Sequence, residues 1–453
     1  MSFLIKNANV VDGTGGLPHQ ADILIQSGRI LAVGGLSDYR ADEYLDAAGA
    51  FATPGFIDLV SYADLVSSPF NDYRQEDYLK QGITTVVIGH SGQSLAPIFG
   101  QSTEHNRDWG LWSDFMRSTS RSRFGINFLS FVGCHNLFHA DERVSLALLN
   151  DSLGNGAVGI SFGGTKYPGF SGHLIHLAES AASRGRLIAA TLPLFLPAKE
   201  RERLLLSLLQ AKRRGEYGSS SGHASSRLVV SGVSLNDIDY LKRSRSLREV
   251  IIGYNPYGLR LIPISSFLPR AQSRDLPSLE KSLRRANPSA IFIINSSSLS
   301  PRHESLSSFS RRARLSPAAA LLRISKNNPH TLLAVNTYSS PNWSPLKEQS
   351  VFLSALISSG PVHPFREFIN LGLLNSSWSL PKVINRLSAA PAAALGIGGD
   401  RGIISPGRRA DINLIGQEGD IKTTIVGGVV SFSTRAHSRL HPALAGALSH
   451  VDL

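Results

Sequence analysis

Residues 54–65 read PGFIDLVSYADL, a Pro-Gly pair followed by a short apolar run that carries Asp58. A short apolar run next to a turn is typical of a buried strand. Val60 and Tyr62 follow directly, at the point where the strand is expected to end. What these two positions do in the fold therefore decides which chemistry the chain can perform.

The middle of the chain contains about eight apolar runs that alternate with helical stretches. Because the runs are apolar throughout, they indicate a parallel sheet that is buried on both faces. Their number predicts an α/β fold, a (β/α)8 TIM barrel, with any active site at the C-terminal ends of the strands. The candidate strands are residues 82–89, 125–133, 156–164, 186–195, 226–235, 249–257, 290–297 and 330–338.

Both ends of the chain predict strands of a smaller sheet. Residues 3–11 and 22–33 alternate apolar and polar side chains, and residues 421–432 predict a strand pair with Gly427 and Gly428 as its hairpin turn. We therefore expect a small β-sandwich domain formed from both termini. The predicted boundaries are 1–53 and 401–435 for the two parts of the β-sandwich, 54–400 for the barrel with a Ser/Arg-rich insertion at about 265–325, and 436–453 for a C-terminal tail.

Seven blocks, in order along the chain, resemble the amidohydrolase superfamily and, within it, the N-acyl-D-amino-acid deacylases. They include LDAAGAFATPGFID (45–58), GITTVVIGHSGQSLAP (82–97) and LSAAPAAALGIGGDRGIISPGRRADINLI (387–415). The resemblance extends over most of residues 5–432. It implies a TIM barrel with a small β-domain, and hydrolysis of the non-peptide C–N bond of N-acyl-D-amino acids.

The chemistry that the resemblance implies depends on zinc, which polarises the amide carbonyl and lowers the pKa of a bound water, and on an aspartate that moves the proton. The family's aspartate falls on Thr337. Its metal-ligand positions fall on Val60, Tyr62, Ser91, Leu192 and Gly232. Alkyl groups and hydroxyls are poor zinc ligands. We therefore expect no metal cofactor and a barrel that is impaired in the family's mechanism.

Five other donors could form a relocated metal site. His135 and His139 are spaced i, i+4, and His173 and His176 are spaced i, i+3, so the two histidines of each pair could share one face of a helix. Surface and helix-packing histidines give the same pattern, and nothing in the sequence brings the two segments together. The candidates are Cys134, His135, His139, His173 and His176.

Three residues are candidates for binding a small acidic ligand such as an N-acyl amino acid. Tyr257, in NPYGLR, matches a tyrosine that the resemblance associates with gripping the substrate's carboxylate. Arg260 lies nearby and could pair with a carboxylate bidentately. His90 follows a candidate strand on the expected active-site face. A barrel-lining tyrosine and a hydrogen-bonded histidine are the structural alternatives.

The formal net charge of +12 would allow contact with nucleic acid or an anionic membrane. The basic clusters at 211–215, 241–248 and 310–316 look scattered, and none is interleaved with aromatic residues that stack on bases. The sequence therefore favours a solvated basic surface over nucleic-acid binding. We expect a soluble, cytoplasmic protein for three reasons. The chain has a single cysteine, its N-terminus lacks the apolar core of a signal peptide, and it contains no apolar run of about 18 residues.

Three functions remain open from the sequence. The first is a catalytically impaired relative of the deacylases, and the second is an active hydrolase with a relocated metal site. The third is a non-catalytic binding protein that uses its basic surface. The second requires bound metal, and the third predicts binding that weakens with salt.

Overall fold

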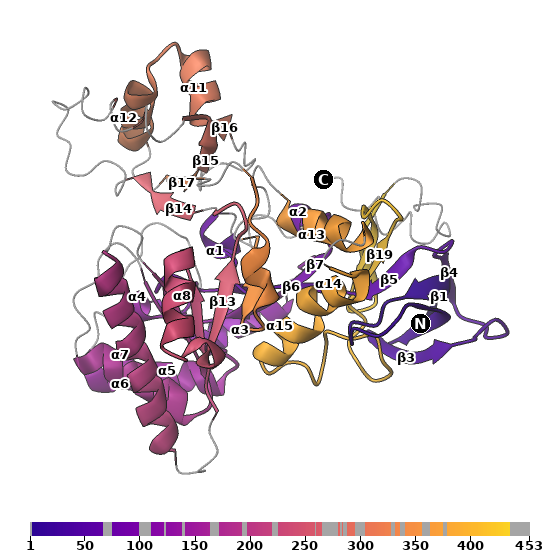
Figure 1. Ribbon diagram of the computed structural model, residues 1–453. Helices are drawn as coiled ribbons and strands as arrows, with labels where there is room; N and C mark the ends of the chain where they lie inside the picture. The colour runs from indigo at the N-terminus through magenta and orange to yellow at the C-terminus, as the bar shows by residue number, and fades with distance from the viewer. Residues whose placement is uncertain are drawn as a thin grey trace.

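The computed structural model describes residues 2–66, 75–98, 110–121, 124–137, 141–163, 172–192, 197–219, 225–258, 260–264, 280, 283, 288–294, 304–327, 331–335, 340–355, 363–374 and 378–434. These residues form two parallel sheets with helices around them, which together we call the barrel, a β-domain that contains the first and last described strands, and a lobe inserted between two barrel strands (Figure 1). None of the described helices is long and apolar enough to cross a membrane.

Parallel strands follow one another around the barrel. Three strands form one sheet and six form another, and every neighbouring pair within them is parallel. β8 and β9 act as one strand that is interrupted at Phe131. In spatial order the strands are β6 (Phe56–Asp58), β7 (Ile83–Ile88), β8 (Asn127–Ser130), β9 (Val132–Gly133), β10 (Gly159–Phe162), β11 (Leu187–Thr191), β12 (Leu228–Ser231), β13 (Val250–Tyr254) and β18 (Val351–Leu353).

The two end strands, β6 and β18, meet through the residues that follow them. Ser354 Oγ donates to the Val60 carbonyl at 2.7 Å, and the Ala355 N–H donates to the Asp58 carboxylate at 3.2 Å. Within the described residues β6 and β18 share no backbone ladder. This seam is therefore held by side-chain contacts.

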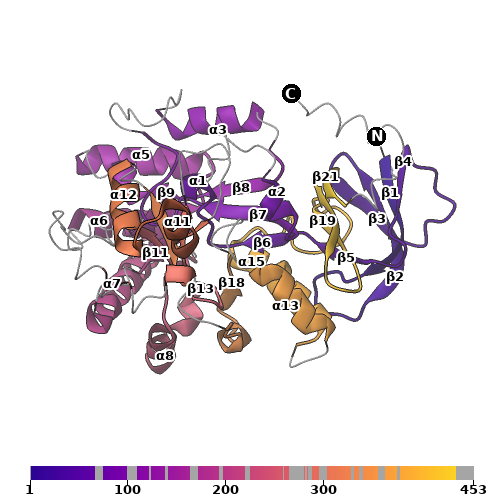
Figure 2. The same cartoon turned by 90° about the horizontal axis from the view of Figure 1, so that it is seen from above.

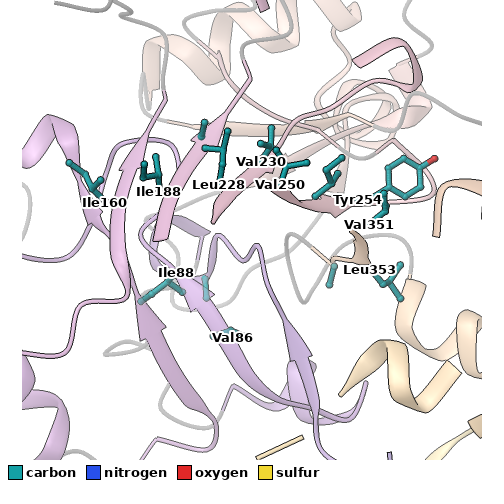
Figure 3. Packing of buried hydrophobic residues seen from close by; sticks show 14 of the residues in the cluster. Val86, Ile88, Ile160, Ile188, Leu228, Val230, Val250, Tyr254, Val351 and Leu353 are labelled. Carbon is teal, nitrogen blue, oxygen red and sulfur yellow. The ribbon is translucent and has the colours of Figure 1, made fainter. Parts of the chain in front are cut away.

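Side chains of the barrel strands alternate between the interior and the helix layer, as the two-residue period of a strand requires. The interior cluster contains Ile57, Val60, Val87, Ala189, Val229, Ile251 and Phe352. Their chain neighbours pack outward, and Figure 3 shows Val86, Ile88, Ile188, Val230 and Val351 among them. The described helices around the strands are α1 (Ala63–Val66), α2 (Glu76–Leu79), α3 (Trp112–Arg121), α4 (Cys134–Leu137), α5 (Glu142–Gly154), α6 (Gly172–Ser183), α7 (Ala198–Tyr217), α8 (Leu235–Arg243), α13 (Pro364–Leu373), α14 (Leu380–Leu387) and α15 (Ala389–Ala394), with the 3-10 turns η1 (Leu247–Glu249) and η3 (Ser344–Lys347).

The β-domain combines strands from both ends of the chain in one eight-stranded sheet, and the predicted sandwich with its boundaries stays a prediction. The predicted hairpin at Gly427 and Gly428 is confirmed, since β20 and β21 pair antiparallel and both glycines have positive φ, +56° and +80°. The strands are β1 (Ser2–Val10), β2 (His19–Gln26), β3 (Arg29–Gly34), β4 (Glu43–Asp46), β5 (Phe51–Pro54), β19 (Ile412–Ile415), β20 (Ile421–Val426) and β21 (Val429–Ser433).

A lobe between β13 and β18 overturns part of the predicted barrel. Residues 290–297 and 330–338 were expected as barrel strands, and this prediction is wrong, because β15 and β17 pair antiparallel in a separate four-stranded sheet. The last barrel strand is β18. The lobe contains β14 (Arg260–Pro263), η2 (Pro288–Ala290), β15 (Ile291–Ile294), β16 (Glu304–Ser305), α11 (Leu306–Ala313), α12 (Pro317–Asn327) and β17 (Leu332–Val335).

The lobe lies beyond the C-terminal ends of the barrel strands. Figure 1 shows it past the tip of β13, and Figure 2, seen from above, shows α11 and α12 over the barrel. Ala334 of β17 belongs to the interior cluster of the barrel, and Phe292 of β15 packs against that cluster. The lobe therefore covers part of the barrel mouth with apolar side chains.

Candidate functional site

Four hydroxyl groups meet at the C-terminal ends of the barrel strands. Tyr62 follows β6 and Ser91 follows β7, while Thr191 ends β11 and Ser231 ends β12. The Tyr62 hydroxyl lies 3.1 Å from Ser91 Oγ and 3.3 Å from Thr191 Oγ1. Ser91 Oγ donates to Thr191 Oγ1 at 3.0 Å, and Thr191 Oγ1 lies 3.0 Å from Ser231 Oγ. We call these four residues the hydroxyl cluster.

The hydroxyl cluster occupies the place where the resemblance predicts metal ligands. Two of its members, Tyr62 and Ser91, are themselves predicted ligand positions, and the structure brings them together. Its other two members directly precede the predicted positions Leu192 and Gly232. The sequence analysis missed Thr191 and Ser231, although each is a polar residue that ends an apolar run.

The three remaining described ligand positions have packing roles. Val60 is fully buried, and its side chain fills the space beside Gly253 of β13, where a Cβ atom would lie 2.3 Å from Val60 Cγ2. Leu192 is buried in the outer hydrophobic layer. Gly232 has φ +70°, and a Cβ there would lie 2.8 Å from the Leu192 carbonyl oxygen, so a larger side chain at this position requires the backbone to move.

The position of the catalytic aspartate changes with the strand assignment. Thr337 lies outside the described residues, and β17, which precedes it, is not a barrel strand. The residues that follow the last barrel strand, β18, are Ser354 and Ala355. Residues 351–363 contain neither aspartate nor glutamate. The corrected assignment therefore also lacks a carboxylate general base at this point.

Two carboxylates near the mouth bind backbone N–H groups. Asp58 is fully buried and accepts hydrogen bonds from the N–H groups of Val60 and Ala355, both at 3.2 Å. Asp64 accepts a hydrogen bond from the Gly89 N–H at 3.0 Å. Both carboxylates of the PGFIDLVSYADL stretch thus join neighbouring strand ends to one another.

His90 is buried, with 2% of its surface exposed. Its Nε2 atom lies 3.1 Å from the Leu59 carbonyl oxygen, and its ring packs edge-on against Phe131 at 5.1 Å. Burial lowers the pKa of His90 to about 4, against the raising effect of hydrogen bonds to the Leu59 and Val87 carbonyls. The imidazole is therefore neutral at pH 7. The ligand-binding role of His90 stays a prediction, since its described contacts are with residues of its own chain such as Leu59 and Phe131.

Tyr257 donates a short hydrogen bond to the Glu367 carboxylate of α13. Burial raises the pKa of Tyr257, and the hydrogen bond to Glu367 raises it further. The predicted anion-gripping hydroxyl thus already has a carboxylate partner, one that the sequence analysis missed. The backbone of Arg260 begins β14, and its side chain lies outside the described residues. The binding roles of both residues stay predictions.

The candidates for a relocated metal site do not converge where they are described. Cys134 is buried, and burial raises the pKa of its thiol to about 12, which keeps it protonated. His176 pairs through Nδ1 with the Glu142 carboxylate at 2.5 Å, and this hydrogen bond raises its pKa. His139 lies outside the described residues. Within the described part of the chain no three histidine, cysteine or acidic side chains come close enough to hold a metal ion.

The residues at the barrel mouth do not fit zinc. Zinc is bound in proteins by thiolate, imidazole and carboxylate groups, usually four in a tetrahedron. The hydroxyl cluster offers four neutral oxygen atoms that already bond one another. The two carboxylates closest in sequence bind backbone N–H groups instead.

Comparison with known proteins shows similarity to deacylases. The chain is 27% identical over 287 residues to N-acyl-D-aspartate deacylase of Alcaligenes xylosoxydans xylosoxydans. The aligned region covers 56% of this chain and 56% of that protein. It is 34% identical over 212 residues to N-acyl-D-glutamate deacylase of the same organism, 41% and 43% of the two chains. The chain thus matches about half the length of these curated relatives. No protein-family model matches it.

Solved structures show a similar fold over almost the whole chain. N-acyl-D-glutamate deacylase from Bordetella bronchiseptica, complexed with zinc and a phosphonate inhibitor, superposes with a TM-score of 0.70 at 22% identity, covering 95% of this chain and 96% of that one. A D-aminoacylase structure gives a TM-score of 0.67 at 19% identity, covering 96% and 97%. At these identities the likeness establishes the fold.

Proposed function

We propose, from the premise that the chain is related to the N-acyl-D-amino-acid deacylases of the amidohydrolase superfamily, that it no longer hydrolyses amides by their zinc mechanism. The hydroxyl cluster is the observation that carries this proposal. Tyr62, Ser91, Thr191 and Ser231 are uncharged and bond one another at 3.0–3.3 Å. Together they line the barrel mouth with neutral hydroxyl groups, which are poor ligands for a divalent cation such as zinc.

The proposal follows from the requirements of amide hydrolysis. A free water has a pKa far above neutrality, and a bound metal lowers it to about 7, so that hydroxide forms at neutral pH. A general base could assist, but it needs a suitable pKa and a free lone pair. His90 is buried with a pKa of about 4, and Asp58 and Asp64 accept hydrogen bonds from the backbone. Within its described residues the mouth therefore has no set of ligands that would hold a metal and activate a water, and its carboxylates are engaged by backbone N–H groups.

A barrel without metal can still bind a ligand. As part of the proposal, the ligand is a small acid such as an N-acyl amino acid, which is supported by the substrates that the relatives' names state. Tyr257 is the proposed contact for its carboxylate. Because Tyr257 donates to Glu367, the ligand must displace this side chain, and Glu367→Gln is expected to strengthen binding.

An active hydrolase with a relocated metal is the alternative. This alternative requires Cys134 to be a thiolate, but burial keeps its thiol protonated. It also requires a free His176 imidazole, but His176 is paired with Glu142. The deciding test is hydrolysis of N-acetyl-D-glutamate and N-acetyl-D-aspartate after loading with zinc, with the Bordetella bronchiseptica enzyme as positive control.

The two functions predict different outcomes in this assay. Our proposal predicts no release of free amino acid above the rate without protein. Zinc-dependent release that is lost in the His135→Ala or His176→Ala variant would contradict it and establish the alternative. Binding is measured separately by a thermal shift with N-acetyl-D-glutamate, and Tyr257→Phe is the matched control that should abolish the shift.

A further inference from the structure

The positive charge of the chain is concentrated in the lobe. Residues 260–335 contain 12 of the 46 lysines and arginines but 3 of the 34 aspartates and glutamates, which gives this segment +9 of the formal net charge of +12. The other 377 residues carry a net charge of +3. The basic clusters look scattered in the sequence, but most of the excess falls within the segment whose described residues form the lobe.

The two described helices of the lobe bury their apolar faces inside it. Leu306 of α11 and Leu321 and Ile324 of α12 belong to a hydrophobic cluster that is separate from the barrel and the β-domain. The described residues of the lobe include no exposed large apolar side chain. The described part of the lobe therefore presents polar and cationic side chains to solvent.

Several exposed cations on and next to the two lobe helices have no acidic partner among the described residues. Arg312 pairs with Glu304 at 2.6 Å. Among the described residues no ion pair is found for the four other exposed cations of the two helices, Arg311, Arg314, Arg323 and Lys326. Arg323 and Lys326 lie beside Asn327 at a shallow, open depression on the surface of α12. Their positive charges are therefore accessible to an anionic group.

We propose that the lobe binds the phosphodiester backbone of nucleic acid without sequence specificity. Four of the five cations in residues 304–327 are arginines, whose planar guanidinium groups bind phosphate bidentately. An anionic membrane is less well matched, because peripheral helices add an exposed apolar face to their charge and α11 and α12 have buried theirs. This binding is independent of what the barrel mouth binds.

The test is fluorescence anisotropy of a labelled 20-base-pair DNA duplex and of an RNA duplex of the same length, titrated with the full chain at 50–200 mM salt. The test variant removes the four unpaired cations by Arg311→Gln, Arg314→Asn, Arg323→Gln and Lys326→Gln. A matched control removes four exposed cations elsewhere by Arg40→Gln, Arg203→Gln, Arg243→Gln and Arg248→Gln. All eight side chains are exposed, so both variants are expected to fold, which an unchanged unfolding midpoint confirms.

We expect the wild-type chain and the control to bind with a dissociation constant of roughly 1–10 μM at 50 mM salt, with affinity falling steeply as salt rises. Each lost phosphate contact reduces the slope of log K against log salt by about 0.9, so the test variant should lose up to about 3.6 of this slope. Equal slopes for test variant and control would overturn the proposal. So would tighter binding to phosphatidylserine-containing vesicles than to either duplex.

Discussion

His90→Gln tests whether the histidine beside the hydroxyl cluster is a neutral packing residue. Its pKa of about 4 in the fold lies below the value of 6.5 in the unfolded chain. As the pH falls below 6.5, the unfolded chain takes up the proton more readily, so the folded state loses stability until the pH reaches about 4. With these two values the loss is about 2 kcal/mol at pH 5 and about 0.2 kcal/mol at pH 7.

The assay is urea unfolding of the wild-type chain and the His90→Gln variant at pH 5, 6, 7 and 8. Glutamine can still donate to the Leu59 carbonyl but has no proton to gain, so it supplies the baseline for all other titrating groups. We expect the wild type to lose about 2 kcal/mol relative to the variant between pH 7 and pH 5. A difference that does not change with pH would refute the reasoning, and a rise toward low pH would indicate a charged, anion-binding histidine.

Three further predictions concern the same region. Tyr62→Phe removes two hydrogen bonds and should lower the free energy of unfolding by about 1 kcal/mol in the same urea assay, while an unchanged value would mean that the cluster contributes nothing to stability. Gly232→Ala should cost about 2 kcal/mol more than Gly49→Ala, because the positive φ of +70° to +78° is common to both glycines but only the first change would force a Cβ to within 2.8 Å of a carbonyl oxygen. Equal costs would contradict the close approach. Cys134 should react with a disulfide reagent in urea but not in the native state, and rapid native labelling would contradict its buried, protonated thiol.

Much of the architecture could be predicted from the sequence, and its errors have a common physical cause. Six barrel strands and the hairpin at Gly427 and Gly428 are confirmed, and so is the resemblance to the N-acyl-D-amino-acid deacylases. The runs that became β15 and β17 are as apolar as barrel strands, because their lobe has a hydrophobic cluster of its own. Composition shows that a strand is buried but not which strand it pairs with. β18 is only three residues long, too short for a periodic signal.

The candidate site was predictable position by position but not as a set of contacts. The sequence placed Tyr62 and Ser91 at strand ends, yet their shared partner Thr191 comes from a strand 100 residues after Ser91. His90 and Ser91 lie in the turn after β7, where Ser91 has a left-handed φ of +59°, so no strand periodicity predicts that Ser91 joins the cluster while His90 packs against Phe131. The pairing of Tyr257 with Glu367, 110 residues apart, leaves no local pattern at all.

The central claim is that uncharged hydroxyls have replaced a metal cage at the barrel mouth. Zinc content tests it most directly, measured by mass spectrometry on protein without a histidine tag after incubation with excess zinc and exhaustive dialysis. The hydroxyl cluster predicts less than about 0.1 zinc per chain, since such oxygens are poor ligands. Retention of about one zinc per chain or more would contradict the claim, because only a set of thiolate, imidazole or carboxylate donors holds the ion through dialysis.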